Sequence, residues 1–390
     1  MTDVSCPIGC DEEIENHIDY LLSCVLDDEF SHFENLINGG IIPENKCGCT
    51  LFHIAAKFRR LQICELFLIN CNVKNPANHK GITPFHLVVE NDDSTQCRVM
   101  LKFLKNDNER NPRCNHGFTP LFIAAQLGHL KMCRRLLLEN STETNPRRND
   151  GSTPLHIATY RGHISIVKMI LKKVTDKNPE KNDGVTPLHL AAGIGDINLI
   201  KLFAKDVKDL GIKDVRGVTP LYNAASNGHV EAVKFLMEGM KDINSKAENG
   251  YTPLLVAAQN GHLDVFKLIY EKVQDKNLND EQWSGPHGST PLHVAASFGH
   301  FEIFTYFWEK VEDKFPKNDI GMTPLHNAAE AGRFSICSFI IDNVKNIHPR
   351  DKDGKTPLDL AVGHKAIEHL FNKYKKSARY NHRTKIWVSN

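Results

Sequence analysis

The chain has 390 residues, of which 48 are basic and 47 acidic, so its formal net charge is +1. Such a balance gives no global field that would attract nucleic acid or an anionic membrane. A single compact core of this length would normally divide into two or three domains, unless the chain grows by repetition. The charge is uneven at the ends: residues 1–45 carry eleven carboxylates and no Lys or Arg, whereas residues 365–390 carry seven Lys or Arg against Glu368.

The start of the chain has no apolar segment of the kind a signal peptide needs, and no apolar run approaches the roughly 18 residues of a membrane-spanning helix. The eleven cysteines are odd in number and occur in a long chain without a leader, which favours reduced thiols. These features predict a cytoplasmic protein, with the nucleus as the alternative.

Residues 1–45 contain two segments with apolar residues at helical spacing, Glu13 to Val25 and Phe30 to Ile37, followed by Gly39-Gly40. An acidic helical pair at this place would shield the first hydrophobic layer of a repeat array from water. We therefore expect residues 1–45 to form an N-terminal cap.

One octet dominates the rest of the chain: Gly-Ser-Thr-Pro-Leu-His-Ile-Ala at residues 151–158, with near copies before and after it. Its threonines fall at residues 50, 83, 119, 153, 186, 219, 252, 290, 323 and 356. The intervals are 33 residues, except for single intervals of 34, 36 and 38. The motif and its period resemble the ankyrin repeat over residues 46–376. This resemblance implies an all-α solenoid of ten stacked helix–turn–helix units with projecting β-hairpin-like fingers, which binds protein partners and has no catalytic activity.

The repeat at residues 151–183 shows how one unit is expected to fold. Thr153 is placed to cap a helix, Pro154 suits the first helical position, and Gly162 ends this inner helix. A longer outer helix follows, with apolar residues from Ile164 to Val174, and then a turn-rich finger at residues 176–184. Where the family usually places glycine after the outer helix, this chain has Val174, Val207, Val273, Val311 and Val344. Valine resists a positive φ, so these helices are expected to run longer or to end differently.

The last repeat has Asp359 in place of the motif histidine and continues through Ala366 to Tyr374, which suits a C-terminal cap. Residues 377–390 form a basic tail. The tail is either a solvated segment or a contact for nucleic acid or acidic lipid.

Histidines and cysteines are the candidates for metal chemistry. Eleven of the twenty histidines recur once per repeat, at His53, His86, His156, His189, His293 and His326, and at His129, His163, His229, His262 and His300. Neighbouring repeats lie about 10 Å apart, too far for these histidines to share one zinc ion. For the first six, which occupy the motif position, a bond to the capping threonine and the finger backbone is expected. Cys6, Cys10, Cys47 and Cys49 could form a zinc site, but their spacing is not the usual CxxC pair, and buried thiols are the alternative. No metal and no cofactor is therefore assigned.

Enzymatic motifs are missing as well. Gly193-Ile194-Gly195 lacks the third glycine of a dinucleotide loop and falls between the helices of one repeat. No phosphate loop, HExxH or GxSxG pattern occurs, so neither catalysis nor a small-molecule substrate is expected.

A partner surface follows from the resemblance, because two sets of positions have no structural role in an ankyrin stack. One set follows the first glycine and the other precedes the second, and both would line a concave face. The candidates at these positions are Phe118, Tyr160, Arg161, Val185, Ile194, Val218, Asn227, Tyr251, Asn260, Phe298 and Met322. The 38-residue interval adds Trp283 at the tip of a polar insertion, either as a partner anchor or packed on the neighbouring finger.

The sequence therefore predicts a non-catalytic scaffold or adaptor for a protein partner. The alternative is a regulatory or targeting subunit of a larger enzyme or channel complex. A spanning helix is not expected, nor is nucleic-acid binding.

Overall fold

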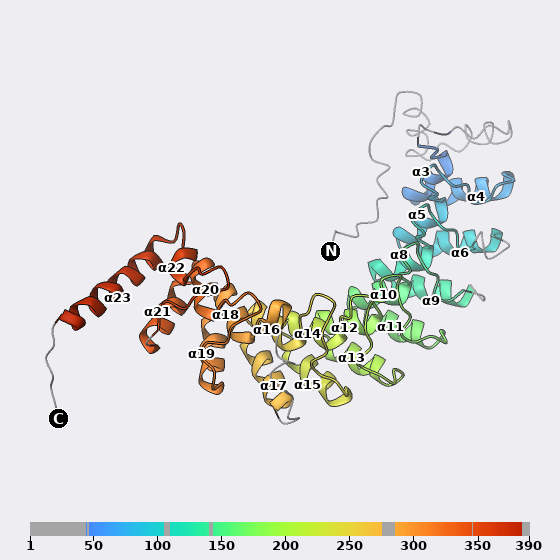
Figure 1. The fold of residues 1–390 in the computed structure, drawn as a ribbon. Coiled ribbons are helices and arrows are strands. Elements are labelled where there is room, and N and C mark those ends of the chain that lie inside the picture. Colours follow the sequence, from blue (N-terminus) through green and yellow to red (C-terminus); the bar gives the residue numbers. More distant parts are fainter. Residues whose placement is uncertain are drawn as a thin grey trace. The chain divides into compact units, whose positions relative to one another are not determined.

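The computed structural model describes residue 44 and residues 47–104, 110–139, 143–274, 285–344 and 346–383, with side chains up to Tyr374 in the last range. These residues form twenty α-helices and one short 3-10 helix, η2 (Pro286–Gly288), and they form no β-sheet (Figure 1). The all-α prediction is confirmed. The predicted N-terminal cap, its cysteines Cys6 and Cys10, the Trp283 insertion and the end of the basic tail lie outside the described residues.

The chain divides into two compact units, residues 1–187 (unit 1) and residues 188–390 (unit 2). Each unit is a series of helix pairs in which an inner helix is followed by an outer helix. None of the helices in the described parts is long and apolar enough to cross a lipid bilayer.

The inner helices begin at the Pro of the repeated octet, except that α3 begins at Leu51, which stands at the same place. In unit 1 they are α3 (Leu51–Lys57), α5 (Pro84–Glu90), α8 (Pro120–Leu127) and α10 (Pro154–Tyr160). Those of unit 2 are α12 (Pro187–Ile194), α14 (Pro220–Ser226), α16 (Pro253–Asn260), α18 (Pro291–Phe298), α20 (Pro324–Glu330) and α22 (Pro357–Leu360). Successive inner helices contact one another within each unit.

The outer helices form a second row. Unit 1 contains α4 (Leu61–Asn70), α6 (Ser94–Phe103), α9 (Leu130–Glu139) and α11 (Ile164–Leu171). Unit 2 contains α13 (Ile197–Ala204), α15 (Val230–Gly239), α17 (Leu263–Gln274), α19 (Phe301–Lys310), α21 (Phe334–Asn343) and α23 (Lys365–Arg383).

Small residues let the inner helices approach closely. The Ala-Ala pairs of α3, α8, α14, α16, α18 and α20 are fully buried. Between the two helices of a pair the chain turns at glycine: Gly128 ends α8 with φ +81°, and a Cβ atom there would lie 2.8 Å from the His163 ring of the next repeat. Glycine is required at this place by both backbone conformation and space.

The fingers are closed by main-chain bonds. In the finger before α5, the Asn78 amide donates to the Ile82 carbonyl at 2.9 Å, and the Gly81 amide donates to Asn78 at 2.8 Å. The next finger joins it, since the Asn115 amide donates to the Lys80 carbonyl at 2.9 Å. These bonds give turns that resemble hairpins without building a sheet across the repeats.

Outer helices such as α19 and α21 do not end at a left-handed glycine, because the residue at that place is valine and a positive φ is unfavourable for valine. Val311 follows α19 with φ −95° and ψ 149°, and Val344 follows α21 with φ −132° and ψ 152°, so both continue in extended conformation. A lysine three residues after the valine covers the helix end: the Lys177 ammonium donates to the Val174 carbonyl at 2.7 Å and also to that of Leu171. Lys314 makes the same two contacts at the end of α19. The lysine thus satisfies terminal carbonyls that a glycine cap would otherwise satisfy.

At the C-terminus, α23 continues through Arg383. The boundary expected at residue 376 therefore falls inside this helix. Thr356 and Asp359 form a capping box at the start of α22, where Asp359 replaces the motif histidine.

Candidate binding surface

The motif histidine links the start of its own inner helix to the finger of the following repeat. In α10, the Nδ1 atom of His156 accepts a hydrogen bond from the Thr153 amide at 3.2 Å and lies 2.9 Å from the Thr153 hydroxyl. Its Nε2 atom lies 3.2 Å from the carbonyl oxygen of Val185 in the following finger. Because a carbonyl only accepts, Nε2 carries the hydrogen and the imidazole is the neutral Nε2–H tautomer. The same contacts are made by His53, His86, His293 and His326.

Burial keeps these rings neutral. Desolvation lowers the pKa of His53, His86, His156 and His293 to about 4, against an opposing effect of the bond to the finger carbonyl. The pKa of His326 is lowered for the same reason. A ring that has both nitrogens engaged in the scaffold and resists protonation is not available as a ligand or a general base.

The second histidine of each repeat points back to the preceding inner helix. His262 Nε2 lies 3.0 Å from the Ser226 carbonyl, and His300 Nε2 lies 2.7 Å from the Gln259 carbonyl. His129, His163 and His229 make the equivalent contact. The bonding predicted for the motif histidine is confirmed at His53, His86, His156, His293 and His326. The second histidines hold the preceding inner helix instead, a contact that the sequence did not predict.

The cysteines are also part of the packing. Burial raises the pKa of Cys97, Cys133 and Cys337 to about 12, so these side chains stay protonated thiols. The described part of the chain contains no cluster of three or more potential metal ligands. Cys49 is buried, and its sulfur accepts a hydrogen bond from the side-chain amide of Asn78 (Nδ2) at 3.1 Å.

The first set of expected partner residues is largely buried, which corrects the prediction that they are accessible. Phe118 is only 3% exposed: its ring packs edge-on against Phe122 at 5.2 Å, and the Arg148 guanidinium covers it at 4.0 Å. Val185, Val218 and Met322 are buried as well. Their carbonyls accept the histidine bonds described above, so this position belongs to the scaffold.

The second set lies at the ends of the inner helices and is accessible. Tyr160 is 39% exposed and Phe298 is 41% exposed; Arg161, Asn227 and Asn260 are exposed. Ile194 is half-buried, as is Tyr251 from the first set. Trp283 lies outside the described residues.

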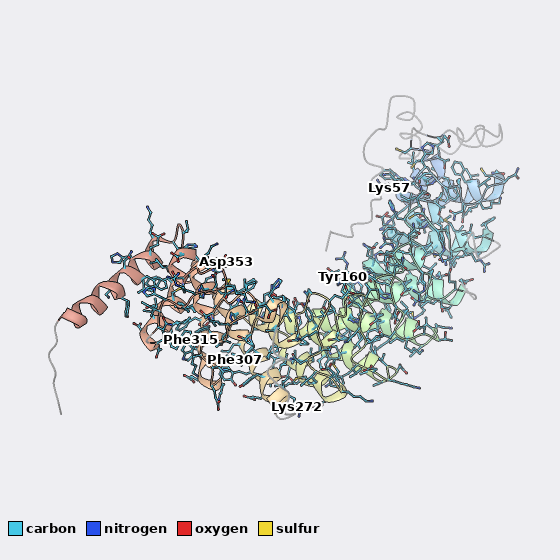
Figure 2. The ribbon with its side chains drawn as sticks, in the orientation of Figure 1. Lys57, Tyr160, Lys272, Phe307, Phe315 and Asp353 are labelled. Carbon is cyan, nitrogen blue, oxygen red and sulfur yellow. The ribbon has the colours of Figure 1, made fainter. Side chains whose placement is uncertain are left out.

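In unit 1 these positions form what we call inner surface 1: Phe58, Leu127, Tyr160 and Arg161. Phe58, Leu127 and Arg161 each lie eight residues after their capping threonine, at the ends of α3, α8 and α10, and Tyr160 is the last residue of α10. Helices α8 and α10 contact each other, and α5 lies between α3 and α8. The Arg161 guanidinium lies 5.8 Å from the Tyr160 ring centroid. Figure 2 shows Tyr160 at the inner-helix edge of the unit. Leu127 obeys the same positional rule but did not stand out in the sequence, because a single leucine is inconspicuous.

In unit 2 the equivalent inner surface 2 consists of Ile194, Asn227, Asn260 and Phe298, with Tyr251 beside them. The amides of Asn227 and Asn260 each donate at 2.7 Å to a carbonyl of the preceding inner helix, from Gly193 and Ser226 respectively. These bonds hold the two side chains while leaving them exposed. The surface is therefore preorganised, which lowers the entropic cost of ordering side chains on binding.

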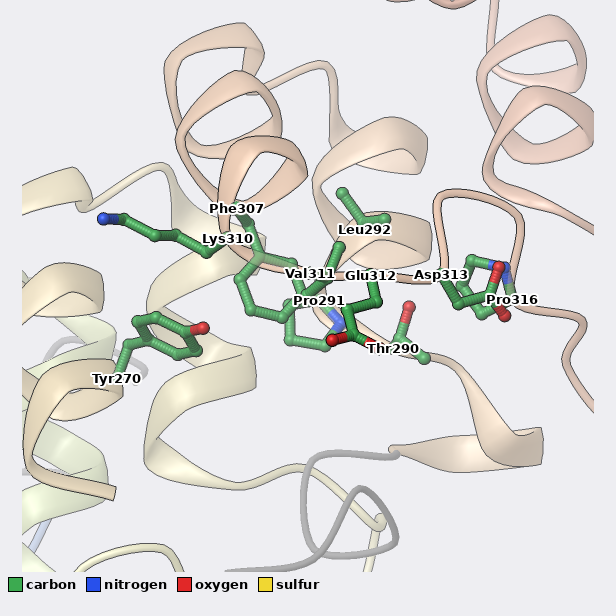
Figure 3. Close-up of a pocket in the computed structure, with 10 residues that line it drawn as sticks. All are labelled: Tyr270, Thr290, Pro291, Leu292, Phe307, Lys310, Val311, Glu312, Asp313 and Pro316. Carbon is green, nitrogen blue, oxygen red and sulfur yellow. The ribbon is translucent and has the colours of Figure 1, made fainter. Parts of the chain in front are cut away.

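A separate cavity of about 420 Å³ lies in unit 2 between outer helices α17 and α19 and the start of α18 (Figure 3). Its apolar wall is made by Tyr270 and Phe307, whose rings meet edge-on at 5.2 Å, together with Pro291. Its rim carries Lys310, Glu312 and Asp313. This cavity could not be predicted from the sequence, because its walls come from two repeats and its apolar residues follow the pattern of core residues.

The comparison with protein families agrees with this architecture. A model described as ankyrin repeats (3 copies) matches residues 52–148, 135–214, 188–280, 239–317, 274–351 and 292–383. No curated protein matches the chain as a relative. Ankyrin repeats are generally modules for protein–protein interaction. The overlapping matches run from residue 52 to residue 383, and together with the stacked helix pairs they show that the chain belongs to the ankyrin-repeat family.

Proposed function

We propose that the chain is a non-catalytic scaffold or adaptor that binds a protein partner through inner surfaces 1 and 2. The observation that carries this proposal is the contrast between buried scaffold and exposed helix ends. The recurring Thr, His and Gly residues cap the inner helices, form the turns and bond neighbouring repeats to each other. Tyr160, Arg161 and Phe298 make no such joint. Arg161 and Phe298 each lie directly before the second glycine of their repeat, and Tyr160 precedes Arg161.

The side chains fit that role chemically. Tyrosine and phenylalanine are large and lose little conformational freedom when a partner buries them, and arginine adds a planar group with several hydrogen-bond donors. The asparagines between them supply polar contacts whose positions are already fixed by bonds to the scaffold.

We place this function in the cytoplasm. The eight described cysteines form no disulfide, and the most deeply buried ones are protonated thiols, which suits a reducing compartment.

The proposal is tested by affinity capture from native lysate with quantitative mass spectrometry. The bait variant carries Tyr160→Ala, one change in inner surface 1, and Phe298→Ala, one change in inner surface 2. A matched control carries Ile69→Ala and Phe334→Ala, which remove apolar side chains that are at least as exposed from outer helices α4 and α21.

A partner recovered by the unaltered chain and by the control, but lost with the inner-surface variant, supports the proposal. Loss with the control instead would assign binding to the outer helices and contradict it.

A further inference from the structure

A ladder of basic side chains runs along the outer helices. The position fifteen residues after the capping threonine is Glu65 in α4 but Arg98 in α6, Arg134 in α9 and Lys168 in α11. The three basic side chains are exposed. Figure 1 shows α6, α9 and α11 side by side, and they contact one another in sequence, so these charges stand about 10 Å apart on one side of unit 1.

Other basic residues widen the ladder into a face. Lys102, Lys131 and Lys172 are exposed on or directly beyond the same helices, and we call these six residues the basic face: Arg98, Lys102, Lys131, Arg134, Lys168 and Lys172. The sequences of α6, α9 and α11 contain one carboxylate, Glu139. Within the described part of the chain, no member of the basic face forms an ion pair with a carboxylate. The near-zero net charge of the whole chain therefore hides a strongly positive local surface.

An aliphatic side chain protrudes from this face. Leu138 near the end of α9 is 69% exposed and occupies the same repeat position as Lys102 and Lys172, nineteen residues after the capping threonine. A leucine flanked by lysines at one level of the surface is the combination that interfacial membrane binding uses: electrostatic attraction plus insertion of an apolar side chain.

We propose that the basic face of unit 1 binds a membrane surface rich in anionic lipid head groups, with Leu138 entering the interface. Helices that lie side by side present their charges to one plane, so that a bilayer can contact several of them at once. A nucleic-acid partner fits less well. The exposed large apolar residues of α6, α9 and α11 are aliphatic, whereas bases stack on aromatic rings, and no single helix projects to enter a groove.

Unit 2 offers an internal comparison. The ladder position is occupied there by Lys201 in α13, Lys234 in α15 and Lys267 in α17, but α15 and α17 also carry Glu231, Glu238, Asp264 and Glu271. Lys234 forms an ion pair with Glu231 at 2.7 Å, and the Lys267 ammonium lies 5.2 Å from the Tyr306 ring centroid. A variant that removes the charges of Lys234 and Lys267, at the equivalent positions in unit 2, is therefore a matched control.

The test is sedimentation of the full chain with vesicles of 70% phosphatidylcholine and 30% phosphatidylserine, and with phosphatidylcholine alone. The test variant carries Arg134→Gln and Lys168→Gln, and the control carries Lys234→Gln and Lys267→Gln. We expect the unaltered chain to bind only the vesicles with phosphatidylserine, and more weakly as salt is raised. The test variant should bind about thirtyfold more weakly, which corresponds to about 1 kcal/mol for each charge removed, and the control should bind like the unaltered chain.

Two further measurements keep the lipid assignment open to failure. Leu138→Ala should lower the vesicle partition coefficient several-fold while leaving the salt dependence unchanged. Equal weakening by the test and control variants, or no binding to phosphatidylserine vesicles, would overturn the proposal. Polyglutamate and duplex DNA are added as competitors. If either binds the chain more tightly than the phosphatidylserine vesicles do, the basic face is assigned to an acidic protein or to nucleic acid, and the membrane proposal is overturned.

Discussion

The Nε2 atom of His156 lies 3.2 Å from the carbonyl oxygen of Val185, 29 residues away at the start of the next repeat. The other nitrogen of the same ring receives the Thr153 amide. One neutral imidazole therefore ties the beginning of an inner helix to the following finger. It does so inside the core, where an unsatisfied polar group is costly.

The first prediction concerns this joint. His156→Ala should lower the free energy of unfolding by about 2 kcal/mol, because it leaves the Thr153 amide and the Val185 carbonyl buried without this partner. His163→Ala in the same repeat removes a half-buried ring with one contact at 3.3 Å and should cost less than about 1 kcal/mol. Urea unfolding followed by circular dichroism measures both. Equal losses of unfolding free energy in the two variants would contradict a distinct stabilising role for the contacts of His156.

The second prediction concerns pH. The four histidines with a pKa of about 4 in the folded state return to about 6.5 on unfolding, so the unfolded chain binds more protons between these values. Their contribution to stability is complete above pH 6.5 and is lost as the pH falls toward 4. Each buried ring should cost about 2 kcal/mol at pH 5 relative to pH 7.5.

Denaturant titrations at several pH values check this, with His156→Gln as the comparison. Glutamine does not titrate, so this variant should start less stable at pH 7.5 but lose stability less steeply between pH 6.5 and 4.5. An unchanged slope would mean that His156 does not carry the pH dependence assigned to it.

The third prediction separates scaffold from surface. Phe118→Ala should lower the free energy of unfolding by about 3 kcal/mol, because it empties a core position and removes the ring beneath Arg148. Tyr160→Ala removes an aromatic ring of similar size from an exposed site and should change stability by less than about 1 kcal/mol. Thermal melts rank the two, and the opposite ranking would restore Phe118 to the accessible surface.

The fourth prediction concerns the lysine at the end of the outer helix. Lys177→Met should cost about 1 kcal/mol, since the ammonium contacts the carbonyl of Leu171, the last residue of α11, and that of Val174 just beyond it. Lys173→Met removes the same charge from an exposed place nearby and serves as the control. Hydrogen exchange at the last turn of α11 should quicken with the first variant only. A similar change in both would point to general electrostatics instead of a cap.

Much of the fold follows from the sequence, because each repeat contains its own start and stop signals. Thr153 and Pro154 mark the first residues of α10, and Gly162 has the positive φ that ends the turn after it. Valine near the end of the outer helix correctly indicates a longer helix or a different ending: Val273 still lies inside α17, and Val311 and Val344 are extended. The lysine that then covers the carbonyls could have been found, since Val174 and Val311 are each followed by an acidic residue and a lysine at the same spacing.

The binding surface could be predicted only in part. Tyr160 and Phe298 are accessible as expected, whereas Phe118, Val185, Val218 and Met322 are buried. The sequence contained a warning, because an apolar residue recurs directly after the first glycine, as in Ile82, Phe118, Val185, Val218 and Met322. Recurrence of apolar residues at one place indicates a core position more often than a recognition site. The basic face was missed because the net charge averages over regions of opposite character.

Hydroxyl-radical footprinting of the chain with and without its captured partner tests the central claim most directly, because it reports side-chain exposure residue by residue. Tyr160 and Phe298 react readily when exposed, and Phe334 gives an internal reference on an outer helix. The account predicts that the partner suppresses oxidation of Tyr160, Phe298 or both, while Phe334 is unchanged. Protection of Phe334 with both inner-surface aromatics still reactive would contradict it.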